Sequence, residues 1–264
     1  MTQKLLNLNA DLGESFGAWP MGSDDAMLRI VNSANVACGF HAGDPLVMFT
    51  TVVLARDGGV SIGAHPAYPD LQGFGRRRMD IPLGELEAIL TYQIGALEAC
   101  ARAHGVRVAH VKPHGALSNV ACAERRVADA IARAIYRLDP SLILLAPAAS
   151  QLIAAGREKG LPVVEEIFAD RAYLDDGNLV PRSQPGAMIH GAEESLRHVM
   201  RMVEENALIS INGKRIPVNP QSICVHGDNV DAVATAQAIK AGLISAGYQL
   251  VSVPDLLTAR PGGS

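Results

Sequence analysis

Short apolar runs alternate with longer amphipathic stretches along the whole chain, and this alternation limits the possible fold more than any other feature. Runs typical of buried strands occupy residues 5–9, 35–38, 60–64, 108–112, 142–146, 163–168 and 222–226. The stretches between and after them predict helices at 24–32, 45–57, 82–104, 124–138, 148–159, 190–206 and 229–246. Strands that alternate with helices form parallel sheets with right-handed crossovers, and this many units favour closure. We therefore expect an α/β fold, a single (β/α) barrel of about seven parallel strands, with residues 1–264 as one domain.

Composition excludes several classes of function. The formal net charge is -4 and the only dense basic run is Arg76 to Arg78, which argues against nucleic-acid binding. The four cysteines form no CxxC pair, so we expect reduced thiols and a cytoplasmic protein. No stretch is apolar and long enough for a signal peptide or a membrane span. These features favour a small, polar substrate and no membrane partner.

Polar residues follow nearly every predicted strand. In α/β barrels the active site lies at the carboxyl ends of the strands, so these are the residues to examine. They are Asn9, Asp11 and Glu14 after the first strand, His41 and Asp44 after the second, His65 and Asp70 after the third, Lys112 and His114 after the fourth, Glu166 in the sixth, and His226 and Asp228 after the seventh. Four histidines at one rim favour a functional pocket over four separate structural roles.

Several of these residues also have structural explanations. Asp44 and Asp228 precede predicted helices and are expected to serve chiefly as N-caps, while Asp70 could simply set a turn. Histidines expected on helices, with structural roles, are His104, His190 and His198.

Lys112 closes a strand expected to be buried, so its ammonium needs a carboxylate partner or an anionic ligand. Glu166 is the natural partner, although a structural ion pair is as plausible as a catalytic one. Asn7 and Asn9 alternate with leucines, which places both on the same face of the first strand.

Three irregular segments separate the elements. Residues 71–80, LQGFGRRRMD, could clamp an anion or form a solvated loop. Residues 174–188 are expected to form a lid or a short hairpin, and residues 209–218 a hairpin around Asn212 and Gly213.

Seven motifs occur in order between residues 7 and 228. They are NLNADLGESFG, ANVACGFHAGDP, GAHPAYPDLQGFGRR, HVKPHGAL, EIFADRAY, NLVPR and ICVHGD. Together they closely resemble the LamB/YcsF family of lactam utilization proteins, which supplies the A component of bacterial 5-oxoprolinase. The polar positions show no departure from the family pattern.

The resemblance implies a barrel related to the glycoside hydrolase/deacetylase superfamily. It also implies opening of the lactam ring of 5-oxo-L-proline to L-glutamate, with hydrolysis of ATP to ADP and phosphate. ATP, with Mg, would be a co-substrate, and the B and C subunits of the enzyme would be partners. A five-membered lactam is an unstrained amide, so phosphorylation of its carbonyl oxygen would supply a leaving group and an electrophilic carbon.

The motifs support a set of site residues whose separate roles follow from chemistry. The catalytic candidates are Asp11, His41, His65, Lys112, His114, Glu166 and His226. The substrate-binding candidates are Asn9, Glu14, Arg76 and Arg171. We expect Lys112 with Arg76 or Arg171 to neutralise phosphate or carboxylate charge, and Asp11 or one of the four histidines to activate water.

Two other functions remain open at this point. The superfamily relationship suggests a metal-dependent deacetylase or amidohydrolase in which Asp11, His65 and His114 would bind the metal. Alternatively, the chain is a non-catalytic subunit that binds the lactam for its partners. The sequence does not decide whether a metal is tightly bound.

Overall fold

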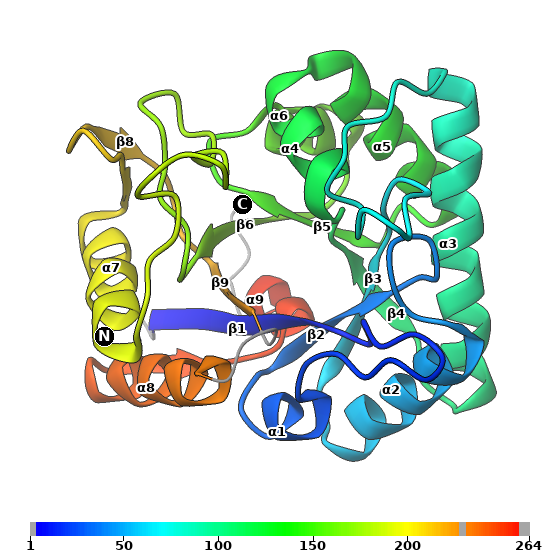
Figure 1. The fold of residues 1–264 in the computed structure, drawn as a ribbon, viewed down its shortest axis with the longest axis horizontal. Coiled ribbons are helices and arrows are strands. Elements are labelled where there is room, and N and C mark those ends of the chain that lie inside the picture. Colours follow the sequence, from blue (N-terminus) through cyan, green and yellow to red (C-terminus); the bar gives the residue numbers. More distant parts are fainter. Residues whose placement is uncertain (1–3, 227–230, 259–264) are drawn as a thin grey trace.

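The centre of the molecule is a closed parallel β-barrel (Figure 1). The computed structural model describes residues 4–226 and 231–258. Within this range, the strands around the barrel are β1 Lys4–Leu12, β2 Ser33–Ala37, β3 Ser61–His65, β4 Val108–Val111, β5 Ile143–Pro147, β6 Val163–Phe168 and β9 Ser222–His226. Each is parallel to the next, and β9 pairs back onto β1 to close the ring. The predicted α/β barrel of about seven strands is confirmed.

Helices surround the strands, with α3 on one side of the barrel and α7 and α8 on the other (Figure 1). The helices are α1 Asp24–Leu28, α2 Pro45–Asp57, α3 Leu83–Ala103, α4 Gly115–Ala123, α5 Arg125–Leu138, α6 Gln151–Lys159, α7 Ala192–Glu205, α8 Ala232–Ser245 and α9 Val253–Thr258. The helices α4 and α9 were not predicted. The predicted helix at 190–206 begins at residue 192, so His190 precedes it.

The alternation of side chains along β1 explains how the barrel is filled. Leu8 and its apolar neighbours at even positions join the main hydrophobic core, which the helices cover. Asn7, Asn9 and Asp11 occupy odd positions and bond to polar groups on other strands, across the barrel in the case of Asn9 and Glu166. Polar side chains that bond to one another therefore line this part of the barrel interior. The main apolar core lies between strands and helices, and a second, smaller apolar cluster contains Ile143, Leu145, Val164, Val253 and Leu256.

Two aspartates hold loops at the rim, as expected from the sequence. The Asp44 carboxylate accepts hydrogen bonds from the backbone N–H groups of Leu46 and Val47 at 2.8 and 3.0 Å, and so caps α2. Asp70 accepts from the backbone of Gly73 at 2.9 Å and pairs with the Arg77 guanidinium. The other expected cap, Asp228, lies outside the described residues.

The two segments predicted to be irregular, 174–188 and 209–218, differ in how much regular secondary structure they contain. Strands β7 Ala207–Ile209 and β8 Arg215–Pro217 pair antiparallel, which confirms the hairpin around Asn212 and Gly213. Residues 174–188 contain no named strand, but Leu179 pairs antiparallel with Tyr173 and Met188 with Arg171 in isolated bridges. Residues of the stretch 174–182 line the edge of the pocket described below. No helix in the described ranges is long and apolar enough to cross a membrane.

Candidate active site

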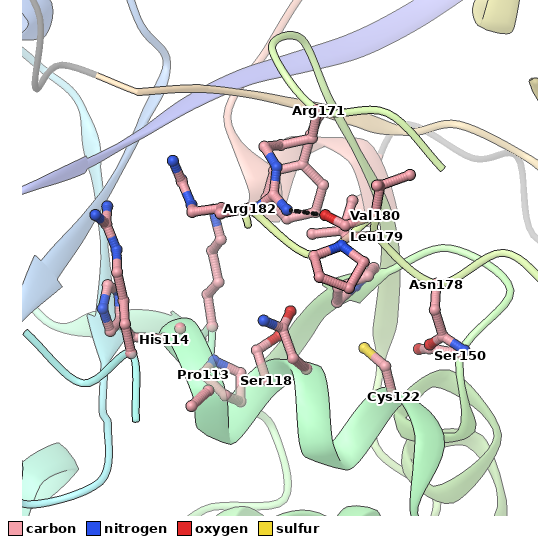
Figure 2. Close-up of a pocket in the computed structure, with 18 of the residues that line it drawn as sticks. Pro113, His114, Ser118, Cys122, Ser150, Arg171, Asn178, Leu179, Val180 and Arg182 are labelled. Carbon is pink, nitrogen blue, oxygen red and sulfur yellow. Dashed lines mark hydrogen bonds between the residues drawn. The ribbon is translucent and has the colours of Figure 1, made fainter. Parts of the chain in front are cut away.

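A pocket of about 620 Å³ opens at the carboxyl ends of the barrel strands. Ionisable side chains from several strand ends line its inner part, and they come from residues far apart in the sequence. These are Asp11, Glu14, His65, Lys112, His114 and His226. The loop at 174–182, helix α4 and the segment after β5 form the outer part (Figure 2). The strand ends that the sequence indicated thus converge on one cavity.

Lys112 follows β4 and lies at the centre of the inner cluster. Its ammonium is 2.9 Å from Asp11 Oδ1, 3.0 Å from Glu166 Oε1 and 3.0 Å from Cys224 Sγ. Burial alone would lower the pKa of Lys112, but the charges of Asp11, Cys224 and Glu166 raise it well above its ordinary value. The predicted partner Glu166 is therefore present, and Asp11 is a second one. Lys112 is a fixed cation in this site.

The two carboxylates differ in their surroundings. Burial favours the neutral form of both groups. In Asp11 this effect is outweighed by His65 and Lys112, which hold its pKa well below the ordinary value. In Glu166, which is completely buried, burial prevails over Lys112 and raises the pKa. Asn9 donates to Glu166 at 2.9 Å and does not line the pocket, so it supports the cluster from beneath.

Three histidines form a compact group beside Asp11. The rings of His41 and His114 stack with centroids 3.8 Å apart, and His65 lies edge-on to both. His65 Nδ1 lies 2.7 Å from the carbonyl oxygen of Lys112, and His114 Nε2 lies 2.8 Å from that of Phe74. Because a carbonyl oxygen only accepts, each of these nitrogens carries a hydrogen.

The remaining nitrogens of two rings face each other. His65 Nε2 and His114 Nδ1 are 3.0 Å apart. In a neutral ring whose other nitrogen carries the hydrogen, each of these two nitrogens has only a lone pair to offer. Such a contact is stable only if a proton or a cation lies between the two nitrogens. Asp11 Oδ2 is 3.2 Å from His65 Nε2, and Glu14 Oε1 is 3.9 Å from His114 Nδ1.

This donor set fits a metal ion. Glu14, His41, His65 and His114 offer ligand atoms within 4.8 Å of one another. Imidazole nitrogens whose other N–H donates to a backbone carbonyl are typical of metal ligands in proteins. The structure thus groups His65 and His114 with Glu14 and His41, whereas Asp11 falls in a second group with Cys224 and His226. Of the trio that the sequence suggested, Asp11 is linked to the first group by its Oδ2, which lies 3.2 Å from His65 Nε2. A metal bound there would act as a Lewis acid.

Two groups in the pocket have pKa values raised above their ordinary values. Burial and the negative charge of Asp11 raise the pKa of Glu14 to about 7. His226 donates from Nδ1 to Asp170 Oδ2 at 2.8 Å. Burial alone would lower the pKa of His226, but Asp170 and Cys224 raise it well above the ordinary value. Glu14 can thus serve as a base and His226 as an acid.

The arginine candidates lie farther out. Arg76 and Arg171 both line the pocket. Arg171 is buried and donates to the carbonyl oxygen of Val180 at 2.8 Å. The Arg76 guanidinium lies 4.9 Å from the centre of the Phe74 ring, and Phe74 has a positive φ of 54°. His41, by contrast, is fully buried and does not line the pocket, but it contacts the lining residues Glu14, His65 and His114.

Sequence reasoning did not single out three further residues of the site. Asp170 orients His226, Cys224 contacts Lys112, and Arg182 lines the pocket. All three lie inside motifs that the sequence analysis quoted, namely EIFADRAY, ICVHGD and NLVPR. Asp170 closely follows β6, but Cys224 lies within β9 and Arg182 in the loop between β6 and α7, so membership of these motifs was the available signal.

The fold and the pocket define a β/α-barrel protein whose acid–base site lies at the carboxyl ends of its strands. The LamB/YcsF family model matches residues 6–258, so the chain belongs to the LamB/YcsF family. Among curated proteins, it is 55% identical over 251 residues to the A component of 5-oxoprolinase from Azoarcus sp., and the match covers 95% of this chain and 98% of that protein.

Solved structures agree with this placement. The lactam utilization protein of Thermus thermophilus is 43% identical and superposes with a TM-score of 0.88, covering 94% of this chain and 99% of that one. The peptidoglycan deacetylase PdaC of Bacillus subtilis has a TM-score of 0.51 at 12% identity, covering 98% and 92% of the two chains. This second likeness is one of fold alone.

Proposed function

We propose that this chain is one component of an ATP-dependent 5-oxoprolinase, which opens the lactam ring of 5-oxo-L-proline to L-glutamate. Nearly full-length similarity to a protein named as the A component of 5-oxoprolinase is the observation that carries the choice of reaction. The pocket supplies the chemistry, because Glu14 and His226 enter it as a base and an acid beside the fixed cation Lys112.

ATP is needed because a resonance-stabilised amide has a poor leaving group. Transfer of the γ-phosphoryl group to the lactam oxygen forms an O–P bond, releases ADP and makes the ring carbon electrophilic. Water then adds to that carbon and loses a proton to a base. The carbon–nitrogen bond breaks as the nitrogen accepts a proton, which leaves an acyl phosphate. A second water hydrolyses it to glutamate and phosphate.

The residues divide these tasks by their charge. Glu14, with its pKa of about 7, takes the proton from the attacking water. His226, held by Asp170, gives a proton to the ring nitrogen. Lys112 stabilises negative charge that develops on the oxygens of the reacting carbon. Arg76 and Arg171 bind the anionic groups of the substrate.

The name of the relative also implies other subunits. We propose that the B and C subunits of 5-oxoprolinase are the partners of this chain, that ATP enters with Mg, and that the assembly is cytoplasmic.

The decisive experiment measures glutamate release from 5-oxoproline with ATP, using the chain alone and then with B and C subunits. We expect glutamate only from the mixture, and its loss when Asp11 is changed to Asn, because Asp11 holds Lys112 and His65 in place. A mixture that retains activity with Asp11→Asn but binds substrate more weakly would favour the non-catalytic binding role. No glutamate from any mixture would refute the proposal.

One observation favours a second candidate, a metal-dependent deacylase. The facing nitrogens of His65 and His114, beside Asp11 Oδ2, are arranged as metal ligands would be. Metal analysis of the purified chain separates the two candidates. A stoichiometric, tightly held transition metal that is lost in His114→Ala, together with absence of glutamate release, would select the deacylase.

A further inference from the structure

The two carboxylate oxygens of Asp11 have different surroundings. Its Oδ1 lies 2.9 Å from the Lys112 ammonium and accepts a hydrogen bond from Asn35 Nδ2, also at 2.9 Å. Its Oδ2 lies 3.2 Å from His65 Nε2 and 3.8 Å from His226 Nε2, and both of these rings line the pocket. One oxygen is thus bound inside the barrel while the other faces the reacting groups, and some neighbour must keep the two from exchanging places.

Lys112 alone does not keep them apart. Its ammonium carries three rotatable hydrogens and bonds equally well to either oxygen of a carboxylate. It also lies 3.0 Å from Glu166 Oε1 and 3.0 Å from Cys224 Sγ, so several partners share it. Asn35 differs from Lys112, because a planar amide offers its two hydrogens in fixed directions. A donor of that kind selects one oxygen of Asp11.

The amide of Asn35 is held from both ends. Its Nδ2 donates to Asn9 Oδ1 at 2.7 Å as well as to Asp11, and its Oδ1 lies 2.8 Å from His110 Nε2. Asn9, Asn35 and His110 are all fully buried. Exchange of the amide oxygen and nitrogen would place an acceptor against the oxygens of Asn9 and Asp11, which is unfavourable. The orientation of Asn35 is therefore fixed.

His110 anchors the oxygen end of this amide. An amide oxygen only accepts, so His110 Nε2 carries the hydrogen. Burial lowers the pKa of His110 to about 3, so the ring is neutral. Its Nδ1 is buried and has no hydrogen-bond partner in the part of the chain that the structure describes, which costs free energy. Gly63 makes room for the ring, because a Cβ there would overlap Nε2. The fold thus accommodates a costly ring that makes one hydrogen bond to the described residues, the bond to Asn35.

We propose that Asn35 and His110 are positioning residues for Asp11, and that they reserve its Oδ2 for the pocket. The inference rests on the proposed function and deepens it, since Asp11 lines the pocket beside Lys112 and His226. Neither Asn35 nor His110 lines the pocket. Asn35 acts through its hydrogen bond to Asp11 Oδ1, and His110 acts through Asn35. Their loss affects the chemical step more than substrate binding, because that step is the more sensitive to the exact place of a reacting group.

His110→Gln and His110→Met form a matched pair of variants, because both replace the ring by an unbranched side chain of similar size. Gln offers an N–H that can take the place of Nε2–H, and Met has no donor. In the reconstituted enzyme, we expect His110→Met to lower kcat by up to about 100-fold, with little change in KM for 5-oxoproline. His110→Gln should recover most of kcat. Equal kcat in the two variants overturns the inference, whether both are low or both match wild type.

Two further variants complete the kinetic test. Asn35→Ser shortens the side chain and removes the amide donor to Asp11, so its kcat should fall as in His110→Met, and it replaces that variant if His110→Met does not fold. A kcat at the wild-type level in Asn35→Ser contradicts the proposal. His104→Met is the control, because His104 lies at the end of α3 and does not line the pocket. Its kcat should be unchanged.

Measurements on the chain alone separate this inference from the proposed function. ¹⁵N NMR of labelled histidines should show the His110 hydrogen on Nε2, with the signal assigned by its loss in His110→Gln. A hydrogen on Nδ1 overturns the inference. Crystal structures should show the Asp11 carboxylate rotated in His110→Met and unchanged in His110→Gln, and an unchanged carboxylate in both is a second result against it.

The two sets of results then distinguish the possible failures. If wild type releases glutamate but kcat is equal in His110→Gln and His110→Met, the positioning role is wrong and the proposed function stands. If Asp11 rotates only in His110→Met but no mixture releases glutamate, the proposed function falls, and the positioning of Asp11 stands for whichever reaction the pocket carries out.

Discussion

Lys112 holds together carboxylates that would otherwise repel one another inside the barrel. Its ammonium lies within 3.0 Å of both Asp11 and Glu166, and all three side chains are buried. Removal of one member of a buried ionic group lowers the stability of a protein far more than replacement of the whole group by apolar residues. The stability of the barrel centre should therefore depend on the balance of charges more than on any single residue.

Substitution of Lys112 by Met should lower the free energy of unfolding by about 3–5 kcal/mol, because two carboxylates lose their cation. The further change Glu166→Gln in that background should restore part of the loss, since it removes one of the two uncompensated charges. Urea unfolding of the purified variants measures both effects. A double variant no more stable than Lys112→Met alone would contradict this account.

The pH dependence of the reconstituted enzyme should report Glu14 and His226. Glu14 acts as a base, so activity should fall as the pH drops through about 7 and the carboxylate becomes protonated. His226 acts as an acid, so activity should fall again as the pH rises through its raised pKa. The profile of kcat/KM against pH is then bell-shaped.

Glu14→Gln provides the check on this assignment. It should lower activity by about 10²–10⁴-fold and remove the acid limb of the profile, because the amide does not titrate. An acid limb that persists in Glu14→Gln would assign it to another group.

At the residue level, the sequence predicted which residues carry the chemistry better than it predicted which of them are in contact. The rule that a buried cation needs an anion predicted the Lys112–Glu166 pair, which is present at 3.0 Å. The second partner, Asp11, could not be predicted, because it depends on how β1 and β4 face each other across the barrel. The link between Asp170 and His226 was missed for the same reason.

Strands β3 and β4 show how closely the elements pack. A Cβ atom at Gly63 of β3 would lie 2.1 Å from His110 Nε2 on β4. His110 is fully buried and its Nε2 lies 2.8 Å from Asn35 Oδ1, so the ring can move aside only by giving up this hydrogen bond. Glycine is required at this position by the neighbouring side chain, and no pattern in the sequence indicated it.

Gly63→Ala should therefore destabilise the chain by about 1–3 kcal/mol or more, since overpacked cores must distort. Gly84→Ala is the matched control, because Gly84 lies in the first turn of α3 and an added Cβ meets no atom within 4 Å. It should be neutral or stabilising by up to about 1 kcal/mol. Thermal unfolding compares the two, and equal stability of both variants would mean that His110 moves aside at little cost.

Elements were predictable where their pattern was strong. The Asp44–Pro45 pair marked the start of α2, and α2 begins at Pro45. Helix α4 was missed because it follows the rim motif directly and consists mainly of small residues, from Gly115 to Ala123. Strand β10 has only three residues, Tyr248–Leu250, and is ordered by its pairing with β1.

At the scale of the whole molecule, alternation of strands and helices was enough to predict a closed barrel. Closure itself depends on β1, which pairs with β2 on one side and with β9 on the other. Periodicity indicates which faces are buried, but not which strands meet at the seam. The pocket depends on this pairing of β1 with β9, since the register places Asp11 of β1 beside His226 of β9.

The pairing of β1 with β9 determines how late in synthesis the barrel can close. β1 leaves the ribosome first, yet its partner β9 begins at Ser222 and β10 only at Tyr248. At translation rates of about 5–20 residues per second, one edge of β1 waits on the order of ten seconds or longer for a partner. During that time Asn7 and Asn9 lack the bonds that they make in the finished barrel to Ser222. Nascent chains should thus depend on chaperones, and a message truncated before β9 would encode a protein with neither a closed ring nor a pocket.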